Sequence, residues 1–598
     1  MTIPRSIDHT QSPSARSRAI GAALAALATL AAAAATAPAA AAAATPGGSV
    51  SLIVRGQPGG AAAVDAAIAR AGGRVTHELA IIDGAAATVP VAGVAALTAD
   101  PAVLRVTPNG AVHLQSDPSG YSPAGDTGSV YNTTLMTGAQ SFWQAGYTGR
   151  GIDVAIIDSG VVPVNGLTAP GKVLYGPDLS PESQQPTRRG LDGFGHGTHL
   201  AGLIGGRDDA AAAGHYAGDS TDFIGMAPDA RIVSVKVADS SGLTDVTQVL
   251  AGIDWVVQHS HDPGMNIRVL DMSFSTDSVQ SYLLDPLAFA TEAAWHAGLV
   301  VTASAGNAGQ RAQLFDPAFD PYVIAVGAAD TMATTSLADD TVASFSQSGD
   351  GSRNPDLVAP GVHLQSLRNP GSLVDAMYPG GLISSRFFRG SGTSQASAIV
   401  AGAAALLLQQ HPYLSNDQVK SLLTSTATPL AGQPRSLQGS GELNLRGALT
   451  AIPPLLAIQL YLPGTGCGSI EGARGTVHLT DNGVTLQGET DIMGNPVLAC
   501  QLASLLHNGA AWIGGVFNGA VWTGSGWIGA QWAGATWTGN SFAGEPWSGG
   551  TWSGGTWSGG TWSGGTWSGG TWSGGTWSGG TWSGGTWSGG TWSSAGWS

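Results

Sequence analysis

The sequence predicts an α/β protein whose main domain is a parallel sheet with helices on both faces. In the middle of the 598-residue chain, short apolar runs alternate with helical patterns, and this alternation is typical of parallel sheets. Before this region, strands and helices are predicted in an order that does not alternate regularly, which indicates a smaller α+β unit. After it, an aromatic residue at every fifth position indicates a repetitive tail. A chain of this length is expected to hold several domains.

The composition excludes two classes of partner. The formal net charge is −16 at pH 7, which argues against binding to nucleic acid or to an anionic membrane surface. The two cysteines, Cys467 and Cys500, form no cluster with histidines at the spacing of a zinc site. We therefore expect no zinc site and no required cofactor.

Residues 1–44 have the pattern of an export signal. Arg5, Arg16 and Arg18 precede a weakly apolar, alanine-rich run over residues 19–35, and several A-x-A sites follow it. This segment has no adjacent pair of arginines, which favours the general secretory route over the twin-arginine route. The alternative is an uncleaved anchor, for which alanine is barely apolar enough. We expect a secreted or cell-surface protein.

Residues 49–115 predict the smaller α+β unit. We expect strands over residues 51–55, 74–82, 84–89 and 103–107, and helices over residues 61–71 and 91–99. The order β-α-β-β-α-β is the ferredoxin-like arrangement. Residues 116–128 are rich in glycine, proline, serine and aspartate, so we expect a linker there.

Residues 129–450 contain the α/β pattern. Its apolar runs cover residues 154–157, 232–237, 269–272, 299–303 and 323–326, and helical patterns cover residues 246–259 and 287–297. A domain of this size has ample room for an apolar core. Because open α/β sheets place their sites at the ends of strands, polar residues there are candidates for chemistry.

Three such residues form a nucleophile, a base and an orienting group. Ser394 lies between a glycine-rich turn and an apolar helix in G-S-G-T-S-Q-A-S-A-I-V-A-G, at the positive end of the helix dipole. Asp158 ends an apolar strand, and His196 begins an apolar helix in H-G-T-H-L-A-G. Ser394 alone could be a helix N-cap. Together with Asp158 and His196 it completes the set that activates a serine.

Four further segments make a resemblance specific: G-M-A-P-D-A at Gly225, V-L-D-M-S-F-S at Val269, A-S-A-G-N-A-G at Ala303 and P-D-L-V-A-P-G at Pro355. With the order Asp, His, Ser along the chain, residues 141–449 resemble the subtilases, which are subtilisin-like serine peptidases. Three positions depart from the family pattern. Gln395 stands where Met is usual, Ala398 where Pro is usual and Ser275 where Gly is usual. None of these changes removes a catalytic group.

The resemblance implies a subtilisin-like fold and a secreted serine endopeptidase that hydrolyses proteins or peptides through an acyl-enzyme. Ser394 would be the nucleophile, His196 the general base and acid, and Asp158 the group that holds the imidazole. Asn307 would stabilise the oxyanion together with the Ser394 backbone N–H; a turn asparagine is the alternative. His199, one helical turn after His196, is expected to be a packing histidine rather than a zinc ligand.

The resemblance also implies two substrate edges and an inhibitor. Residues 49–115 would be a propeptide that assists folding and inhibits the enzyme, with self-cleavage between about residues 112 and 120; an unrelated α+β domain is the alternative. Two edge segments would pair with the backbone of an extended substrate, namely Ser241, Gly242 and Leu243, and Ser273, Phe274 and Ser275.

One stabilising feature, a disulfide, is expected, and a second, bound calcium, is possible. Acidic loops around Asp178, Asp192 and residues 219–222 could bind calcium, as in many subtilases, although none has the EF-hand pattern. Residues 451–508 are expected to form a small β-rich region in which the two cysteines pair, because disulfides form in exported proteins. Two free thiols are the alternative.

Residues 509–598 form a repeat array whose second half is a strict T-W-S-G-G repeat. The pattern resembles pentapeptide-repeat proteins, which coil as four-sided right-handed β-helices with one five-residue unit on each side. The rival is a flexible Gly/Ser tether whose exposed Trp rings bind sugars or cell-wall material. The steady period of five favours the ordered coil.

Two functions from different classes follow. The first is a secreted, self-processed serine endopeptidase that is inhibited by its own propeptide. The second is a surface display or binding protein in which the repeat array is the functional part and attaches the chain to a cell wall or surface. Because Asp158, His196, Asn307 and Ser394 are all present, we favour the first.

Overall fold

The computed structural model describes residues 48–57, 59–109, 122–184, 188–310, 313–481, 484–513 and 516–521, and the strands between residues 547 and 587. The chain divides into two compact units, Met1–Leu114 and Gln115–Ser598, which are described separately. The expected export signal and the expected self-cleavage segment lie outside the described residues. Among the helices that are described, none has both the length and the apolar character to cross a membrane.

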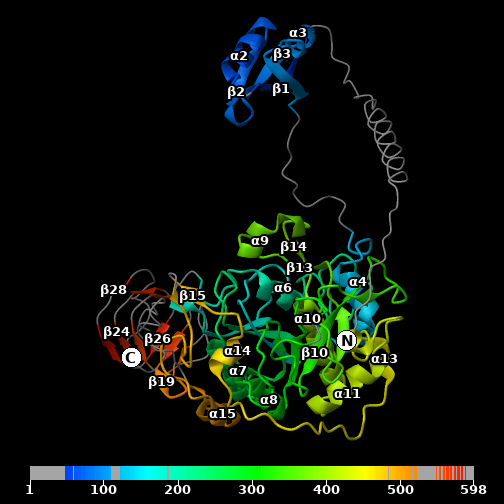
Figure 1. Ribbon diagram of the computed structural model, residues 1–598, viewed down its shortest axis with the longest axis vertical. Coiled ribbons are helices and arrows are strands. Elements are labelled where there is room, and N and C mark those ends of the chain that lie inside the picture. Colours follow the sequence, from blue (N-terminus) through cyan, green and yellow to red (C-terminus); the bar gives the residue numbers. More distant parts are fainter. Residues whose placement is uncertain are drawn as a thin grey trace, which may run out of the picture. The chain divides into compact units, whose positions relative to one another are not determined.

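The first unit has the predicted β-α-β-β-α-β order (Figure 1, blue). Its sheet runs in the order β2-β3-β1-β4, and every neighbouring pair is antiparallel. Val54, Val64, Ile68 and Leu97 belong to one apolar core shared by the sheet and the helices. The elements are β1 (Ser49–Gly56), α2 (Ala61–Arg70), β2 (Arg74–Leu79), the short helix η1 (Ala80–Ile82), β3 (Gly84–Pro90), η2 (Val91–Gly93), α3 (Val94–Thr98) and β4 (Val103–Pro108).

The second unit is built on an eight-stranded sheet in the order β11-β10-β9-β8-β5-β7-β6, with β12 paired to β10. All pairs are parallel except β10 with β11. The five predicted strands are present as β5, β7, β8, β9 and β10. The sequence did not predict β6 and β12, which contain proline and so have a weaker strand pattern. The strands are β5 (Asp153–Asp158), β6 (Val173–Asp178), β7 (Arg231–Lys236), β8 (Ile267–Met272), β9 (Val300–Ser304), β10 (Ile324–Asp330), β11 (Thr341–Val342) and β12 (Leu357–Pro360).

Helices pack on this sheet in two pairs (Figure 1). Helix α6 (His196–Gly205) contacts α10 (Thr393–Gln410), and α7 (Val246–His259) contacts α8 (Pro286–His296). Helix α10 is apolar on all sides and is buried from Thr393 to Leu408, as expected of a helix that crosses a core. The other helices up to residue 450 are η3 (Pro181–Gln184), α4 (Val130–Thr137), α5 (Ala139–Gln144), α9 (Leu373–Met377), η4 (Pro379–Gly381), α11 (Asn416–Thr426), α12 (Arg435–Gln438) and α13 (Leu445–Thr450).

Residues 451–508 differ from the expected β-rich region. They contain two helices, α14 (Ile470–Arg474) and α15 (Ala499–His507), and two strands of two residues, β15 (Thr480–Asp481) and β16 (Val484–Thr485). Helix α14 contacts α7, and α15 contacts α8, so apolar side chains of this region join the main core. The two strands pair with each other in antiparallel fashion, and the rest of the described part of this region is helical or irregular. Cys467 and Cys500 are joined by a disulfide with a Cα–Cα distance of 4.3 Å.

A buried ion pair fixes α14 to the main domain. Arg474 is fully buried, and its Nε lies 2.6 Å from Oδ1 of Asp245, whose side chain is 1% exposed. The other guanidinium nitrogens contact Glu471 and two backbone carbonyls. Because Asp245 also caps the first turn of α7, this contact connects α14 directly to a helix that packs on the main sheet.

The tail forms strands at the predicted period, but its coil has three sides instead of four. Each T-W-S strand pairs in parallel with the strand three units further along; for example, Trp547 pairs with Trp562 and Thr551 with Thr566. The repeat length sets the length of one side, whereas the number of sides depends on the angle at the joints, which a period of five does not specify. The strands are the antiparallel β17 (Trp512–Ile513), β18 (Val516–Phe517) and β19 (Ala520–Val521), and then β20 (Trp547–Ser548), β21 (Thr551–Ser553), β22 (Thr556–Ser558), β23 (Thr561–Ser563), β24 (Thr566–Ser568), β25 (Thr571–Ser573), β26 (Thr576–Ser578), β27 (Thr581–Ser583) and β28 (Thr586–Trp587).

Candidate active site

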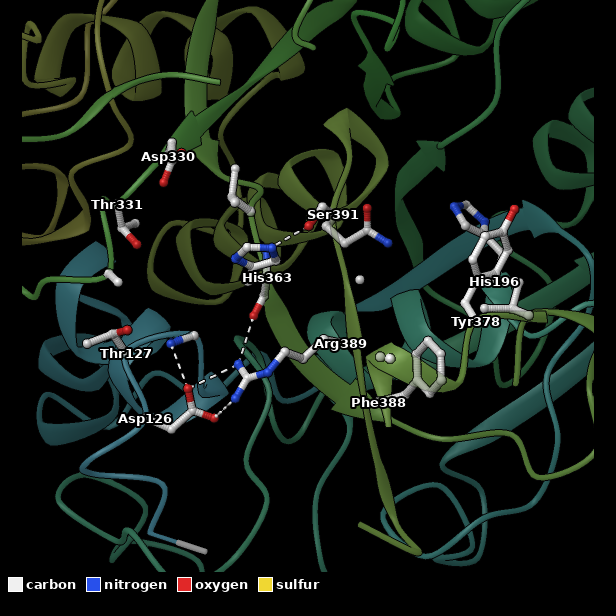
Figure 2. Close-up of a pocket in the computed structure, with 18 of the residues that line it drawn as sticks. Asp126, Thr127, His196, Asp330, Thr331, His363, Tyr378, Phe388, Arg389 and Ser391 are labelled. Carbon is white, nitrogen blue, oxygen red and sulfur yellow. Dashed lines mark hydrogen bonds and ion pairs between the residues drawn. The ribbon is translucent and has the colours of Figure 1, made fainter. Parts of the chain in front are cut away.

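The predicted acid and base lie in direct contact. Asp158 ends β5 and His196 begins α6, so both lie at the carboxyl edge of the sheet. His196 Nδ1 is 3.0 Å from Oδ1 and 2.9 Å from Oδ2 of Asp158. The His196 side chain is 25% exposed and borders a cavity of about 800 Å³ (Figure 2). The base therefore has one nitrogen fixed by a carboxylate while its ring remains accessible from the cavity.

Opposing effects set the pKa of His196. Burial alone would lower the pKa of the imidazole, because it penalises the charged form. The Asp158 carboxylate, its hydrogen bond and the more distant carboxylates of Asp192 and Asp271 outweigh burial, so the pKa is raised above its ordinary value. The cation that forms when His196 takes a proton is thus stabilised by its surroundings.

Asp192 organises the start of α6, a role that the sequence analysis missed. Its buried carboxylate accepts hydrogen bonds from the backbone N–H groups of Phe194 (3.1 Å), Gly195 (2.6 Å) and Thr198 (2.9 Å). The Ser159 hydroxyl lies within hydrogen-bond distance of both Asp192 (2.8 Å) and Asp158 (3.0 Å). Asp192 therefore ties the turn that carries His196 to the end of β5. The sequence feature that could have predicted this role is an acidic residue shortly before an apolar helix.

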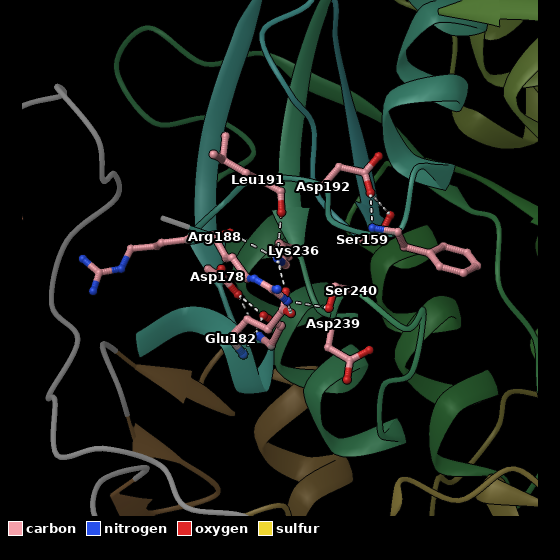
Figure 3. A network of polar contacts seen from close by, with 12 residues as sticks. Ser159, Asp178, Glu182, Arg188, Leu191, Asp192, Lys236, Asp239 and Ser240 are labelled. Carbon is pink, nitrogen blue, oxygen red and sulfur yellow. Dashed lines mark hydrogen bonds and ion pairs between the residues drawn. The ribbon is translucent and has the colours of Figure 1, made fainter. Parts of the chain in front are cut away.

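A buried lysine supports the same turn (Figure 3). Lys236 is 1% exposed, and its Nζ donates to Glu182 Oε2 at 2.9 Å and to the carbonyl of Leu191 at 2.7 Å. Arg188 bridges Glu182 and the Ser240 hydroxyl, each at 2.7 Å. This network fixes the residues before Asp192 and reaches the beginning of the first predicted substrate edge.

The acidic residues considered for calcium have other partners. Asp178 accepts from Ser180 and from the backbone N–H of Gly190, and Asp219 accepts from Thr221. Asp192 uses both oxygens on the start of α6. Within the described part of the chain, no group of three or more His, Cys, Asp or Glu side chains is arranged to hold a metal ion.

Ser394 lies in the first turn of α10 and is 7% exposed. Its Oγ donates to the backbone carbonyl of Ser273 at 2.9 Å. Among the described residues no hydrogen bond joins this hydroxyl to His196, so the structure aligns the acid and base but not the serine. Catalytic hydrogen bonds often form only when the substrate is bound, and a serine side chain can turn about one bond.

Asn307 lies beside the start of α10 with its amide group available. Its Oδ1 accepts from the backbone N–H of Thr393 at 2.9 Å and from the Thr393 hydroxyl at 3.0 Å. These bonds leave the exposed amide NH₂ free to donate. The Ser394 N–H lies in the first helical turn, where backbone N–H groups have no helical partner. The Asn307 amide and the Ser394 N–H are therefore two available donors at the start of α10.

Asp271 is a second carboxyl group that the sequence analysis missed. It lies near the end of β8 and accepts from the hydroxyls of Ser273 (2.7 Å), Ser397 (2.6 Å) and Thr302 (2.8 Å). Burial raises the pKa of Asp271 to about 6. The Ser273 hydroxyl is also 3.2 Å from the carbonyl of Ser394, so Asp271 connects the second substrate edge to the start of α10.

The substrate edges and His199 lie as follows. The turn that contains Ser241, Gly242 and Leu243 is held by Asp239, which accepts from two of their backbone N–H groups. Ser273 is buried, whereas Phe274 and Ser275 are half-buried.

His199 is buried with Nε2 at 3.3 Å from the carbonyl of Phe388, and burial lowers its pKa to about 4. A neutral histidine in this position fits the predicted packing role.

Comparisons with known proteins show what this chain is similar to. Residues 149–444 match the family described as "Subtilase family", and residues 19–109 match the family described as "Putative peptidase inhibitor domain". The chain is 37% identical over 309 residues to "Serine protease AprX" of Bacillus subtilis (strain 168), which covers 50% of this chain and 67% of that protein. It is 32% identical over 386 residues to "Subtilisin E" of the same organism, covering 64% and 84%. It is also similar to the crystal structure of a cold adapted subtilisin-like serine proteinase, with 29% identity, a TM-score of 0.38, and coverage of 50% of this chain and 90% of that one.

Proposed function

This chain belongs to the subtilase family and is a serine endopeptidase, and from that premise we propose that it is a secreted enzyme that uses Asp158, His196 and Ser394 as its triad and frees itself from its own propeptide. The observation that carries the triad is the contact between His196 Nδ1 and both oxygens of Asp158. It fixes the tautomer that leaves Nε2 as the proton acceptor.

The reaction follows from these positions. Ser394 Oγ attacks the scissile carbonyl carbon while its proton passes to His196 Nε2. The negative charge that develops on the carbonyl oxygen is met by the Asn307 amide and the Ser394 N–H, and one such donor contributes about 10²–10³ in rate. His196 then gives its proton to the leaving amine. Water, deprotonated by His196, releases the acyl group in the second half of the reaction.

Substrate binding would activate the serine. In the resting structure Ser394 Oγ donates to the carbonyl of Ser273, which belongs to the second substrate edge. A substrate that pairs with this edge brings a backbone N–H to the same carbonyl. Competition for that acceptor would release the Ser394 hydroxyl and let it turn to His196. The first edge, Ser241 to Leu243, would pair with the opposite edge of the same extended substrate backbone.

Several observations support processing and export. The ferredoxin-like unit matches a peptidase inhibitor domain and precedes the catalytic domain in the chain. Residues 1–44 have the charge and the alanine-rich run of an export signal. We therefore place the mature enzyme outside the cell and assign residues 49–115 as its inhibitor until cleavage.

The tail carries a second, separate function in this proposal, which is attachment to a cell wall or surface. Its parallel strands place identical T-W-S units in register along three sides, which gives a regular surface rather than a simple tether. A chain that ends after Val521 keeps Trp512 and Phe517, which belong to the main core. We expect this truncated enzyme to retain proteolysis and to lose association with the producing cells. Equal retention on the cells would exclude the tail as the attachment.

Proteolysis itself is tested with the purified full-length protein and its Ser394→Ala variant. We expect the wild type to mature and to hydrolyse a generic protein substrate such as casein, with the activity blocked by a serine-directed phosphonyl reagent. Ser394→Ala should stay joined to its propeptide, residues 49–115, and should not cleave casein. Maturation of that variant without another protease would show that self-processing is wrong.

A further inference from the structure

The cavity beside His196 is not lined by either substrate edge. We name it the Arg389 pocket, after a residue on the strand β14 (Phe387–Gly390), which pairs with β13 (Leu364–Leu367). Among the described residues that line it are His196 and Gln395, the neighbour of Ser394, and also Asp126, Thr127 and Gly128 (Figure 2). Its walls therefore join the catalytic centre to the last three residues of the expected linker.

The chain at Asp126 is firmly attached. Its carboxylate forms a two-point ion pair with Arg389, at 3.0 Å to Nη1 and 2.7 Å to Nη2 (Figure 2). Asn132 of α4 donates to three carbonyls of residues 123–126 at 2.8 to 3.2 Å. The carbonyl of Gly128 accepts from the backbone N–H of Gln365 at 2.7 Å. These bonds give the segment a fixed position on the wall of the pocket.

The chemistry of the leaving group indicates which part of a substrate lies in the Arg389 pocket. The leaving amine takes its proton from His196, so the part of a substrate that follows the scissile bond must lie on the His196 side. In the function proposed above, the substrate edges bind the part before the bond, and neither edge lines this pocket. In self-cleavage, the part after the bond runs along the chain to Ser122 and then to Asp126. The end of this segment at Asp126 is therefore already attached to the wall of the Arg389 pocket, on the His196 side.

We propose that the Arg389 pocket holds residues 115–121 of this same chain during self-cleavage, and that the Asp126–Arg389 ion pair sets the position of the cut by its distance from the catalytic centre. This proposal rests on the self-processing proposed above. The segment Q-S-D-P-S-G-Y is small and polar except for Tyr121. The pocket offers an apolar wall for one such ring, formed by Val374, Tyr378 and Phe388. An attached end reduces the entropy cost of bringing the bond to Ser394.

An insertion tests whether distance or sequence sets the cut. Gly-Ser-Gly is placed between Tyr121 and Ser122 in the full-length protein, and the N-terminus of the mature enzyme is read by intact mass and N-terminal sequencing. If distance from Asp126 sets the cut, the mature enzyme keeps the wild-type number of residues before Asp126. If local sequence sets it, the mature enzyme is three residues longer, and the proposal is overturned.

Arg389→Gln removes the attachment, and Arg386→Gln is the matched control. Arg386 lies just before the same strand, pairs with Asp208 and is not among the described residues that line the pocket. We expect Arg389→Gln to mature slowly with several N-termini and Arg386→Gln to give the single wild-type N-terminus. A single wild-type N-terminus from Arg389→Gln would contradict the proposal. If Ser394→Ala matures without another protease, the self-processing hypothesis is wrong. That result is distinct from a failure of the proposal about the Asp126–Arg389 ion pair.

Discussion

Ser394 Oγ and the backbone carbonyl of Ser273 are joined by a hydrogen bond of 2.9 Å, while His196, the expected partner of that serine, is bound to Asp158. The acceptor belongs to a segment that we propose binds the substrate backbone. We propose that the active state differs from this one by rotation of the Ser394 side chain toward His196, and that the substrate supplies the donor that competes for the Ser273 carbonyl.

A substrate that cannot donate at this position should be turned over slowly. We expect N-methylation of the amide of the residue that supplies the scissile carbonyl to lower kcat/KM about tenfold or more, mainly through kcat. The lost N–H can no longer displace the Ser394 hydroxyl from Ser273. Steady-state kinetics measures the effect, with the same peptide methylated one residue earlier as control. A change confined to KM would show that the amide does not release the serine.

The pH dependence of activity should reflect His196. The pKa of His196 is raised above the ordinary value of about 6.5, because Asp158 together with the more distant Asp192 and Asp271 outweighs burial, and only the neutral ring can accept the serine proton. We expect kcat/KM to fall as pH decreases, with a midpoint above about 6.5. In Asp158→Asn we expect a lower midpoint and a loss of about 10⁴ in kcat. A pH–rate profile of both enzymes decides the matter, and an unshifted midpoint in the variant contradicts the assignment.

Asp271 should make stability depend on pH. Burial raises its pKa to about 6, whereas an unfolded aspartate titrates near about 3.9. Because the folded carboxyl binds its proton more tightly, this contribution to stability is complete below about pH 4 and is lost as pH rises through about 6. Asp271→Asn cannot titrate. We therefore expect its free energy of unfolding, relative to wild type, to increase by up to about 3 kcal/mol between pH 4 and pH 7. Urea titrations that give the same difference at both pH values would rule this out.

The contact between Arg474 and Asp245 should stabilise the catalytic domain. Arg474→Met leaves a buried, unpaired carboxylate on α7, so we expect a loss of about 3–5 kcal/mol in the free energy of unfolding. The double variant Arg474→Met/Asp245→Asn removes that charge and should recover part of the loss. Urea denaturation followed by residual proteolysis measures both. Full activity retained with only residues 451–508 unfolded would show that this region is an independent linker.

The sequence predicts those features that depend on neighbouring residues. The strands β5, β7, β8, β9 and β10 contain apolar runs, Asp158 ends one of them, and His196 and Ser394 lie at the starts of apolar helices. Features that arise from contacts between distant segments were missed. Asp192 meets Ser159, and Asp271 meets Ser397, only after folding. The three-sided coil of the tail was also missed, because a repeat period gives the length of a side and not the number of sides.

The most direct test of the account is to label the mature enzyme with a fluorescent phosphonyl reagent and to map the adduct by peptide mass spectrometry. We predict one adduct per molecule, on Ser394, formed at the same rate at which casein hydrolysis is lost, and greatly slowed in His196→Ala. Loss of activity with the adduct on another residue, or full activity with Ser394 modified, would contradict it.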